Sequence, residues 1–115
     1  MKILVITTPI RPVPTEYPPL GSLAVINALK KNGFPDVEFY DIDGQRPDYE
    51  QALKYIIDCR PDVLGISAVV STAYDYVKNL SKDIKRALPD TTIVLGGNLG
   101  ASAEILLRKT GVDFV

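Results

Sequence analysis

Three loops of this chain hold the residues best suited to binding a ligand, and each loop follows a run typical of a strand. The first loop, residues 8–19, includes five of the nine prolines. Proline has no amide hydrogen, so this loop cannot form the nest of amides that holds a phosphate. We expect a stiff wall carrying Ile10, Val13 and Tyr17, or else a surface connection that packs on a neighbouring domain.

The second loop combines hydroxyl groups with small and apolar side chains. Its residues are Ser67, Ala68, Val69, Val70, Ser71 and Thr72. Ser67 stands at the end of a predicted strand and can both donate and accept a hydrogen bond. The small Ala68 is expected to keep the approach open. Thr72 is better interpreted as the cap of the following helix.

The third loop, Gly96-Gly97-Asn98-Leu99-Gly100, has three glycines among its five residues. Because glycine has no Cβ, the backbone here can approach a ligand closely. A tight turn would use the same residue types. The loop therefore indicates a binding site mainly in combination with the other two.

The chain contains no histidine, no tryptophan and a single cysteine, Cys59. These counts exclude a Ser-His-Asp triad, a Cys-His nucleophile pair, a histidine metal site, a disulfide within the chain and an iron–sulfur cluster held by its own cysteines. A net charge of −1 and a pI near 5.3 argue against a nucleic-acid partner. By itself, the chain is not expected to be a conventional catalyst.

The length of 115 residues suits one domain with a substantial core. No apolar run approaches the roughly 18 residues that span a bilayer, so no membrane partner is expected. Residues 1–6 are too short for the apolar part of a signal peptide, and a lone cysteine suits a reducing compartment. We therefore expect a cytoplasmic protein.

Strand-like and helix-like periods alternate along the sequence. Predicted strands cover residues 3–7, 37–42, 63–67, 92–95 and 112–115, and predicted helices cover 20–32, 48–59, 72–88 and 101–110. Asp48 and Gln51 predict a capping box, while Gly33 and Gly111 are expected to end helices. The alternation predicts a doubly wound parallel α/β sheet of five strands, flavodoxin- or Rossmann-like, in the order 2-1-3-4-5. Because no helix follows the last strand, we expect an N-terminal fragment of a longer protein.

In such a sheet, ligands bind beyond the carboxyl ends of the strands, at the switch point between the first and third strands. This rule places the three loops side by side. Asp41 and Asp43 lie near the end of the second predicted strand. Without a glycine-rich fingerprint they are interpreted as turn residues rather than as acids that bind a ribose.

Three short motifs occur in order along the chain: Pro18-Pro19-Leu20-Gly21, Pro61-Asp62-Val63-Leu64-Gly65-Ile66-Ser67 and Ile93-Val94-Leu95-Gly96-Gly97-Asn98. In this order and spacing the sequence resembles the cobalamin (B12)-binding domain that precedes the catalytic domain of B12-dependent radical SAM proteins. The resemblance implies a corrin held against the carboxyl edge of the sheet and presented to a following radical SAM domain. Many members of that family are methyltransferases, in which methylcobalamin delivers the methyl group.

The resemblance also implies roles for individual residues. Ser67, Ala68 and Val69 would border the dimethylbenzimidazole tail of the cofactor, Gly96, Gly97 and Asn98 would line the channel for its nucleotide, and Pro19, Leu20 and Gly21 would lie at the corrin edge. Thr8, Pro9, Val70 and Ser71 complete the expected cofactor-binding set.

The sequence departs from other B12-binding domains, which carry Asp-x-His-x-x-Gly after the first strand. With no histidine anywhere, this chain cannot give cobalt an imidazole, so the resemblance implies base-off cobalamin without a protein ligand to the metal. The Cys-x-x-x-Cys-x-x-Cys motif is also missing. S-adenosylmethionine and a 4Fe-4S cluster are therefore expected in a separate catalytic domain.

Two other functions remain open at this point. A B12-type domain that has lost its cofactor and serves as a docking module would share these features. A receiver-like signalling domain, or another flavodoxin-like protein, would share the fold. A receiver needs an acid pair after the first strand and an aspartate after the third, where this chain has Thr7-Thr8 and Ser67.

Overall fold

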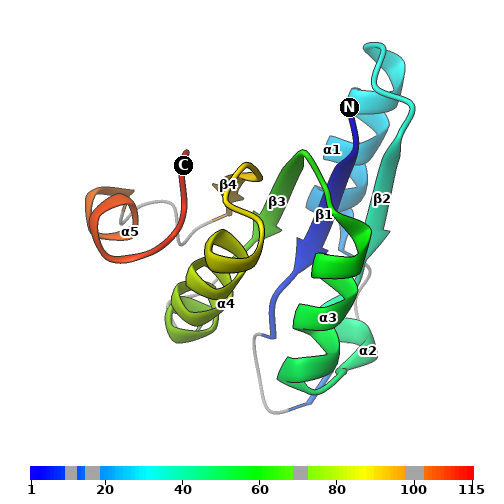
Figure 1. Cartoon of the computed structure of the whole chain (residues 1–115). Coiled ribbons are helices and arrows are strands. Elements are labelled where there is room, and N and C mark those ends of the chain that lie inside the picture. Colours follow the sequence, from blue (N-terminus) through cyan, green and yellow to red (C-terminus); the bar gives the residue numbers. More distant parts are fainter. Residues whose placement is uncertain (10–12, 15–18, 69–72, 98–102) are drawn as a thin grey trace.

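The computed structural model describes residues 1–9, 13–14, 19–68, 73–97 and 103–115 (Figure 1). Its centre is a parallel sheet of four strands in the order β2-β1-β3-β4. The strands are β1 (Ile3–Thr7), β2 (Val37–Tyr40), β3 (Val63–Ser67) and β4 (Thr92–Gly96). The order predicted for the first four strands is confirmed. It places β1 and β3 at the centre, and the direction in which successive strands are added to the sheet reverses between them.

The helices are α1 (Leu20–Lys31), α2 (Ile42–Gln45), α3 (Tyr49–Cys59), α4 (Tyr74–Ala87) and α5 (Ala103–Lys109). Neighbouring residues of a strand point to opposite faces of a sheet. Leu4 and Ile6 of β1 belong to the larger core cluster, which includes the α3 and α4 side chains, whereas Ile3 and Val5 cluster with Ile26 of α1. Helices therefore cover both faces of the sheet, as a doubly wound fold requires (Figure 1).

The start of α3 follows directly from its sequence. The Asp48 carboxylate accepts a hydrogen bond from the Gln51 amide at 2.8 Å, and the Gln51 side chain accepts one from the Asp48 amide at 3.1 Å. This reciprocal pair is the predicted capping box. The apolar stripe that follows buries Ala52 and Ile56 completely against the sheet.

The predicted five-stranded sheet is wrong, because residues 112–115 form only an isolated parallel bridge between Phe114 and Val94 of β4. The Asp113 carboxylate explains the short ladder, since it accepts the Ile93 amide at 2.8 Å in place of a main-chain carbonyl. Lys85 holds the same carboxylate at 2.6 Å. The segment still lies beside β4, where the predicted strand order puts it.

The second predicted strand ends two residues early, and a short helix follows it. Asp41 stops the strand at Tyr40 and caps α2 by accepting the Gly44 amide at 3.1 Å. This turn brings the β2 connection back over the end of β1. None of the described helices is long and apolar enough to cross a membrane.

The two faces of the sheet are not equally covered. In β3 and β4 the side chains on the α3–α4 face, such as Ile66 and Ile93, are buried, whereas Val63 and Val94 on the other face are half-buried. On that second face α1 packs on β1 and β2. β3 and β4 are therefore buried on one face and only half-buried on the other.

Candidate functional site

The carboxyl ends of three strands lie in one row. Thr7 of β1 is paired in register with Ser67 of β3, and Ser67 is paired with Gly96 of β4. The three loops singled out in the sequence therefore begin side by side, as the strand order predicts. Val69, Val70, Ser71 and Asn98 lie outside the described residues.

The second and third loops touch backbone to backbone. The Ala68 amide donates to the Gly96 carbonyl at 3.0 Å. Gly97 has a φ of +96°, and a Cβ added there would lie 2.5 Å from the Ala68 carbonyl oxygen. Glycine is therefore required at this position by both conformation and space. The Ala68 side chain is fully buried, so this residue can offer a ligand its backbone but not an open methyl surface.

Gly96 differs from Gly97 because it faces open space. It is exposed, its φ is not positive, and nothing lies within 4 Å of an added Cβ. Gly21, at the start of α1, is open in the same way. Beside it Pro19 is half-buried and Leu20 is 70% exposed. These positions leave room for a large group above the sheet edge.

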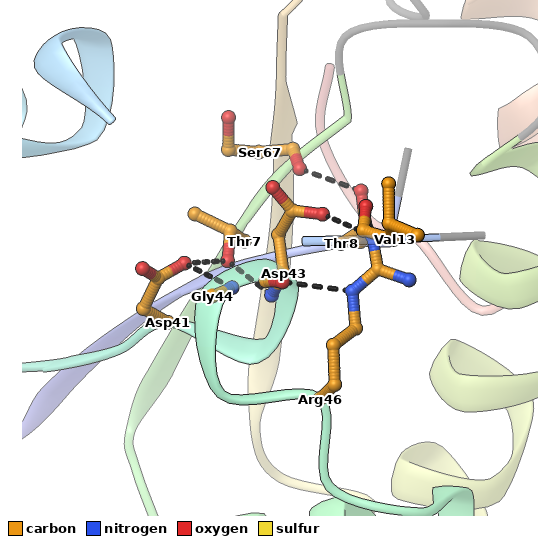
Figure 2. A network of polar contacts seen from close by, with 8 residues as sticks. All are labelled: Thr7, Thr8, Val13, Asp41, Asp43, Gly44, Arg46 and Ser67. Atoms are coloured by element: carbon orange, nitrogen blue, oxygen red, sulfur yellow. Dashed lines mark hydrogen bonds and ion pairs between the residues drawn. The ribbon is translucent and has the colours of Figure 1, made fainter. Parts of the chain in front are cut away.

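Ser67 contributes a hydroxyl group at the centre of the row. Its carbonyl accepts a hydrogen bond from the Thr8 hydroxyl at 2.9 Å, so the backbone of Ser67 is fixed. Within the described part of the chain the Ser67 hydroxyl itself makes no hydrogen bond, and Figure 2 shows it directed away from the polar network beside it. Thr8 is almost completely buried and Pro9 is half-buried. Thr8 therefore fixes the backbone at the end of β3, and the Ser67 hydroxyl is available to a ligand.

A hydrogen-bonded network fixes the end of β1 to the connection after β2 (Figure 2). The Thr7 hydroxyl donates to the Asp41 carboxylate at 2.7 Å and accepts from the Asp43 amide at 3.0 Å. Asp41 therefore caps α2, as expected of a turn residue. Because Thr7 and Asp43 are both buried, the network is shielded from water and geometrically specific.

Arg46 extends this network to the first loop and was not singled out in the sequence. Its guanidinium binds the Asp43 carboxylate through Nη2 at 2.7 Å and the Asp43 carbonyl through Nε at 2.7 Å. Nη2 also donates to the Val13 carbonyl at 2.8 Å. The spacing of three residues between Asp43 and Arg46 is the one available signal in the sequence, and it does not reveal the contact with Val13.

A tyrosine cluster lies behind the edge, between α3 and α4. Tyr49 and Tyr76 meet edge to face with ring centroids 5.9 Å apart. The Tyr49 hydroxyl donates to Asp83, whereas the buried Tyr76 hydroxyl has no hydrogen-bond partner among the residues that the structure describes. Burial, helped by the neighbouring Tyr40, raises the pKa of Tyr76 to about 12. The Tyr76 phenol therefore stays neutral at physiological pH.

The described residues contain no group of three or more histidine, cysteine, aspartate or glutamate side chains that could hold a metal ion. What the edge offers is exposed backbone at Gly96, a hydroxyl at Ser67 and open space beside Gly21. Such a surface suits a large cofactor bound through its periphery.

Comparisons with known proteins agree with this geometry. A family model described as the B12 binding domain matches residues 6–115. The fold is similar to the crystal structure of a cobalamin-binding protein from Desulfitobacterium hafniense DCB-2, with a TM-score of 0.65 and 18% sequence identity. The match covers 98% of this chain and 51% of that one, so the chain spans about half the length of the solved structure. No curated protein sequence matches the chain.

Proposed function

Because the chain belongs to the B12-binding domain family, we propose that it holds cobalamin against the carboxyl edge of its sheet and presents the cofactor to a radical SAM catalytic domain. The row of Thr7, Ser67 and Gly96 is the observation that supports this placement. It joins the ends of three strands at the switch point, where ligands of open α/β sheets bind.

The described residues fit a cofactor held by its periphery. Gly96 lets the backbone approach the nucleotide tail of cobalamin without a side chain in between. The Ser67 hydroxyl can donate to or accept from a polar atom of that tail. Gly21 leaves room at the rim for the corrin. Together these positions provide shape and a hydrogen-bonding group without an ionised side chain.

The chain has no histidine, so it has no imidazole to give to cobalt. We therefore propose base-off cobalamin without a protein ligand on the lower face of the metal. Methylcobalamin, when bound, supplies a methyl group for transfer. The residues of this chain bind and orient the cofactor, and none is assigned a role in the transfer itself.

The partner is proposed to be a radical SAM domain in the same polypeptide, in the cytoplasm. With Cys59 as its single cysteine, the chain cannot hold a 4Fe-4S cluster by itself. The cluster and S-adenosylmethionine are thus assigned to that partner domain. The resemblance of the three loop motifs to B12-dependent radical SAM proteins supports this assignment.

Cobalamin retention tests the proposal directly. The purified chain is mixed with hydroxocobalamin or methylcobalamin and desalted, and the visible spectrum of the protein fraction is recorded. We expect a retained corrin with a base-off spectrum. Loss of all corrin absorbance would overturn cobalamin binding by this chain and favour a docking module that has lost its cofactor.

Two glycine variants locate the site. Gly96→Val places a side chain where the protein leaves open space, so it should block retention without disturbing the fold. Gly65→Ala is the matched control, because its Cβ would make only an ordinary contact, 3.7 Å from Val5, within the same sheet. If Gly96→Val retains cobalamin at the wild-type level, the cofactor does not bind at the end of β4.

A further inference from the structure

The guanidinium of Arg46 joins two segments that are far apart in the sequence. The Arg46 side chain is 22% exposed, and the Asp43 side chain that it binds is 8% exposed. Through the hydrogen bond from Nη2 to the Val13 carbonyl, Arg46 reaches a residue of the first loop 33 positions earlier. Figure 2 shows the guanidinium between Asp43 and Val13.

The other end of this connection is fixed to the sheet. The Asp43 amide donates to the Thr7 hydroxyl at 3.0 Å, and Thr7 is the last residue of β1. Hydrogen bonds therefore run without a break from the end of β1 through Asp43 and Arg46 to Val13. We call these four residues, Thr7, Asp43, Arg46 and Val13, the loop latch.

We propose that Arg46 is a positioning residue, which holds the Val13 segment of the first loop next to the carboxyl edge before cobalamin binds. This inference rests on the proposed function of that edge as the cobalamin site. A loop that is fixed in advance loses less conformational freedom when the cofactor binds, and affinity rises accordingly. Arginine suits the position because its planar fork can donate to two acceptors at once.

Arg60 provides a matched control for Arg46. Both arginines end a helix in the left-handed conformation, with φ values of 51° for Arg46 and 49° for Arg60. Arg60 is exposed, and in the described part of the chain its guanidinium makes no hydrogen bond or ion pair. Replacing either residue by glycine relieves the same backbone conformation. Only Arg46→Gly removes the loop latch.

The first measurement follows the loop without any cofactor. Endoproteinase Glu-C cleaves after Glu16, which follows Val13 by three residues. We expect cleavage of Arg46→Gly at this bond to be about tenfold faster than that of the wild type, because a charge-assisted hydrogen bond is lost. Arg60→Gly should be cleaved at the wild-type rate. Equal rates for Arg46→Gly and the wild type would overturn the loop latch.

The second measurement is the affinity for hydroxocobalamin, obtained by titration and followed by the visible spectrum. Each variant is titrated at the same number of degrees below its own thermal midpoint. We expect about tenfold weaker binding for Arg46→Gly and no change for Arg60→Gly. Arg46→Lys keeps the charge but lacks the fork, and its affinity should lie between the two. Arg46→Lys also replaces Arg46→Gly as the test variant if Arg46→Gly does not fold.

The two measurements separate failure of this inference from failure of the proposed function. Unchanged cobalamin affinity in Arg46→Gly, despite faster cleavage, would show that Arg46 holds the loop without positioning it for the cofactor and would overturn the inference. A wild-type chain that retains no cobalamin would overturn the cofactor role together with the proposed function. The cleavage rates would then still decide whether Arg46 holds the loop.

Discussion

At the scale of single residues, the hydroxyl groups of Tyr49 and Tyr76 differ in whether they have a hydrogen-bond partner. The Tyr49 hydroxyl donates to Asp83, whereas the buried Tyr76 hydroxyl lacks a partner among the described residues. A buried polar group without a partner keeps the cost of its lost hydration, whereas a bond to a carboxylate offsets that cost. The same chemical change should therefore have opposite effects at the two positions.

We expect Tyr76→Phe to raise the free energy of unfolding by up to about 1 kcal/mol, and Tyr49→Phe to lower it by about 1–2 kcal/mol. Urea unfolding of the two variants measures both differences. Removing only the hydroxyl makes each variant the control of the other. A greater loss of stability for Tyr76→Phe than for Tyr49→Phe would contradict the assignment of their partners.

The two adjacent glycines at the end of β4 differ in the space around them and in backbone conformation. Gly97→Ala combines a φ of +96° with a Cβ 2.5 Å from the Ala68 carbonyl oxygen. We expect it to lower the free energy of unfolding by about 2 kcal/mol or more. Gly96→Ala, in open space, should stay within about 0.5 kcal/mol of the wild type. Thermal or urea unfolding compares them, and equal effects would refute the close contact.

At the scale of elements, one ion pair connects α4 with the segment after α5. Burial acts to raise the pKa of Asp113, but the hydrogen bonds from Lys85 and the Ile93 amide, together with the Lys85 charge, outweigh it and hold that pKa below its ordinary value of 3.8. A lowered pKa in the folded state means that the ionised carboxylate stabilises the fold above the unfolded-state value. This contribution disappears as the pH falls through the lower, folded-state pKa.

Asp113→Asn should therefore be less stable than the wild type at pH 7, and the difference should shrink as the pH falls below 3.8. Urea unfolding of both proteins at neutral and at acid pH measures this. Asp58→Asn is a suitable control, because its ion pair with Lys54 is largely exposed and contributes little. A stability difference that grows toward acid pH would contradict the sign.

Much of the fold could be predicted at this scale, because its signals are local. The capping box at Asp48 and the alternation of strands and helices lie within short stretches of sequence. The shortened last strand could not be predicted, since it depends on the Asp113 carboxylate meeting Ile93 from another element. Gly111 was expected to be a helix cap, but its φ is not left-handed. A Cβ there would lie 2.5 Å from the Ser81 carbonyl oxygen, which explains the glycine.

The candidate site, like the fold, could be predicted from the sequence only in part. Its row of strand ends follows from strand order, so Ser67 and Gly96 could be singled out from the sequence. The contribution of Arg46 could not, because its role depends on Val13, which only the folded chain brings near. Side-chain contacts between distant segments leave no local pattern in a single sequence.

At the scale of the whole molecule, the sheet has one complete core and one partial core. Ile93 is fully buried on the α3–α4 face, whereas its neighbour Val94 is half-buried on the face where α1 packs on β1 and β2. We expect Ile93→Ala to lower the free energy of unfolding by about 2–5 kcal/mol and Val94→Ala by about 1 kcal/mol. Urea unfolding distinguishes them. Comparable losses would show that both faces of β4 are equally covered.

The contact between Gly97 and the Ala68 backbone also has a genetic consequence. An obstructing side chain can often be accommodated by a smaller one at the facing position, but here the facing atom belongs to the peptide group itself. No second substitution at position 68 can therefore restore the space. In a randomised library selected for folding, position 97 should return glycine alone, without suppressors at position 68, while position 96 should tolerate many residues until cobalamin binding is selected as well.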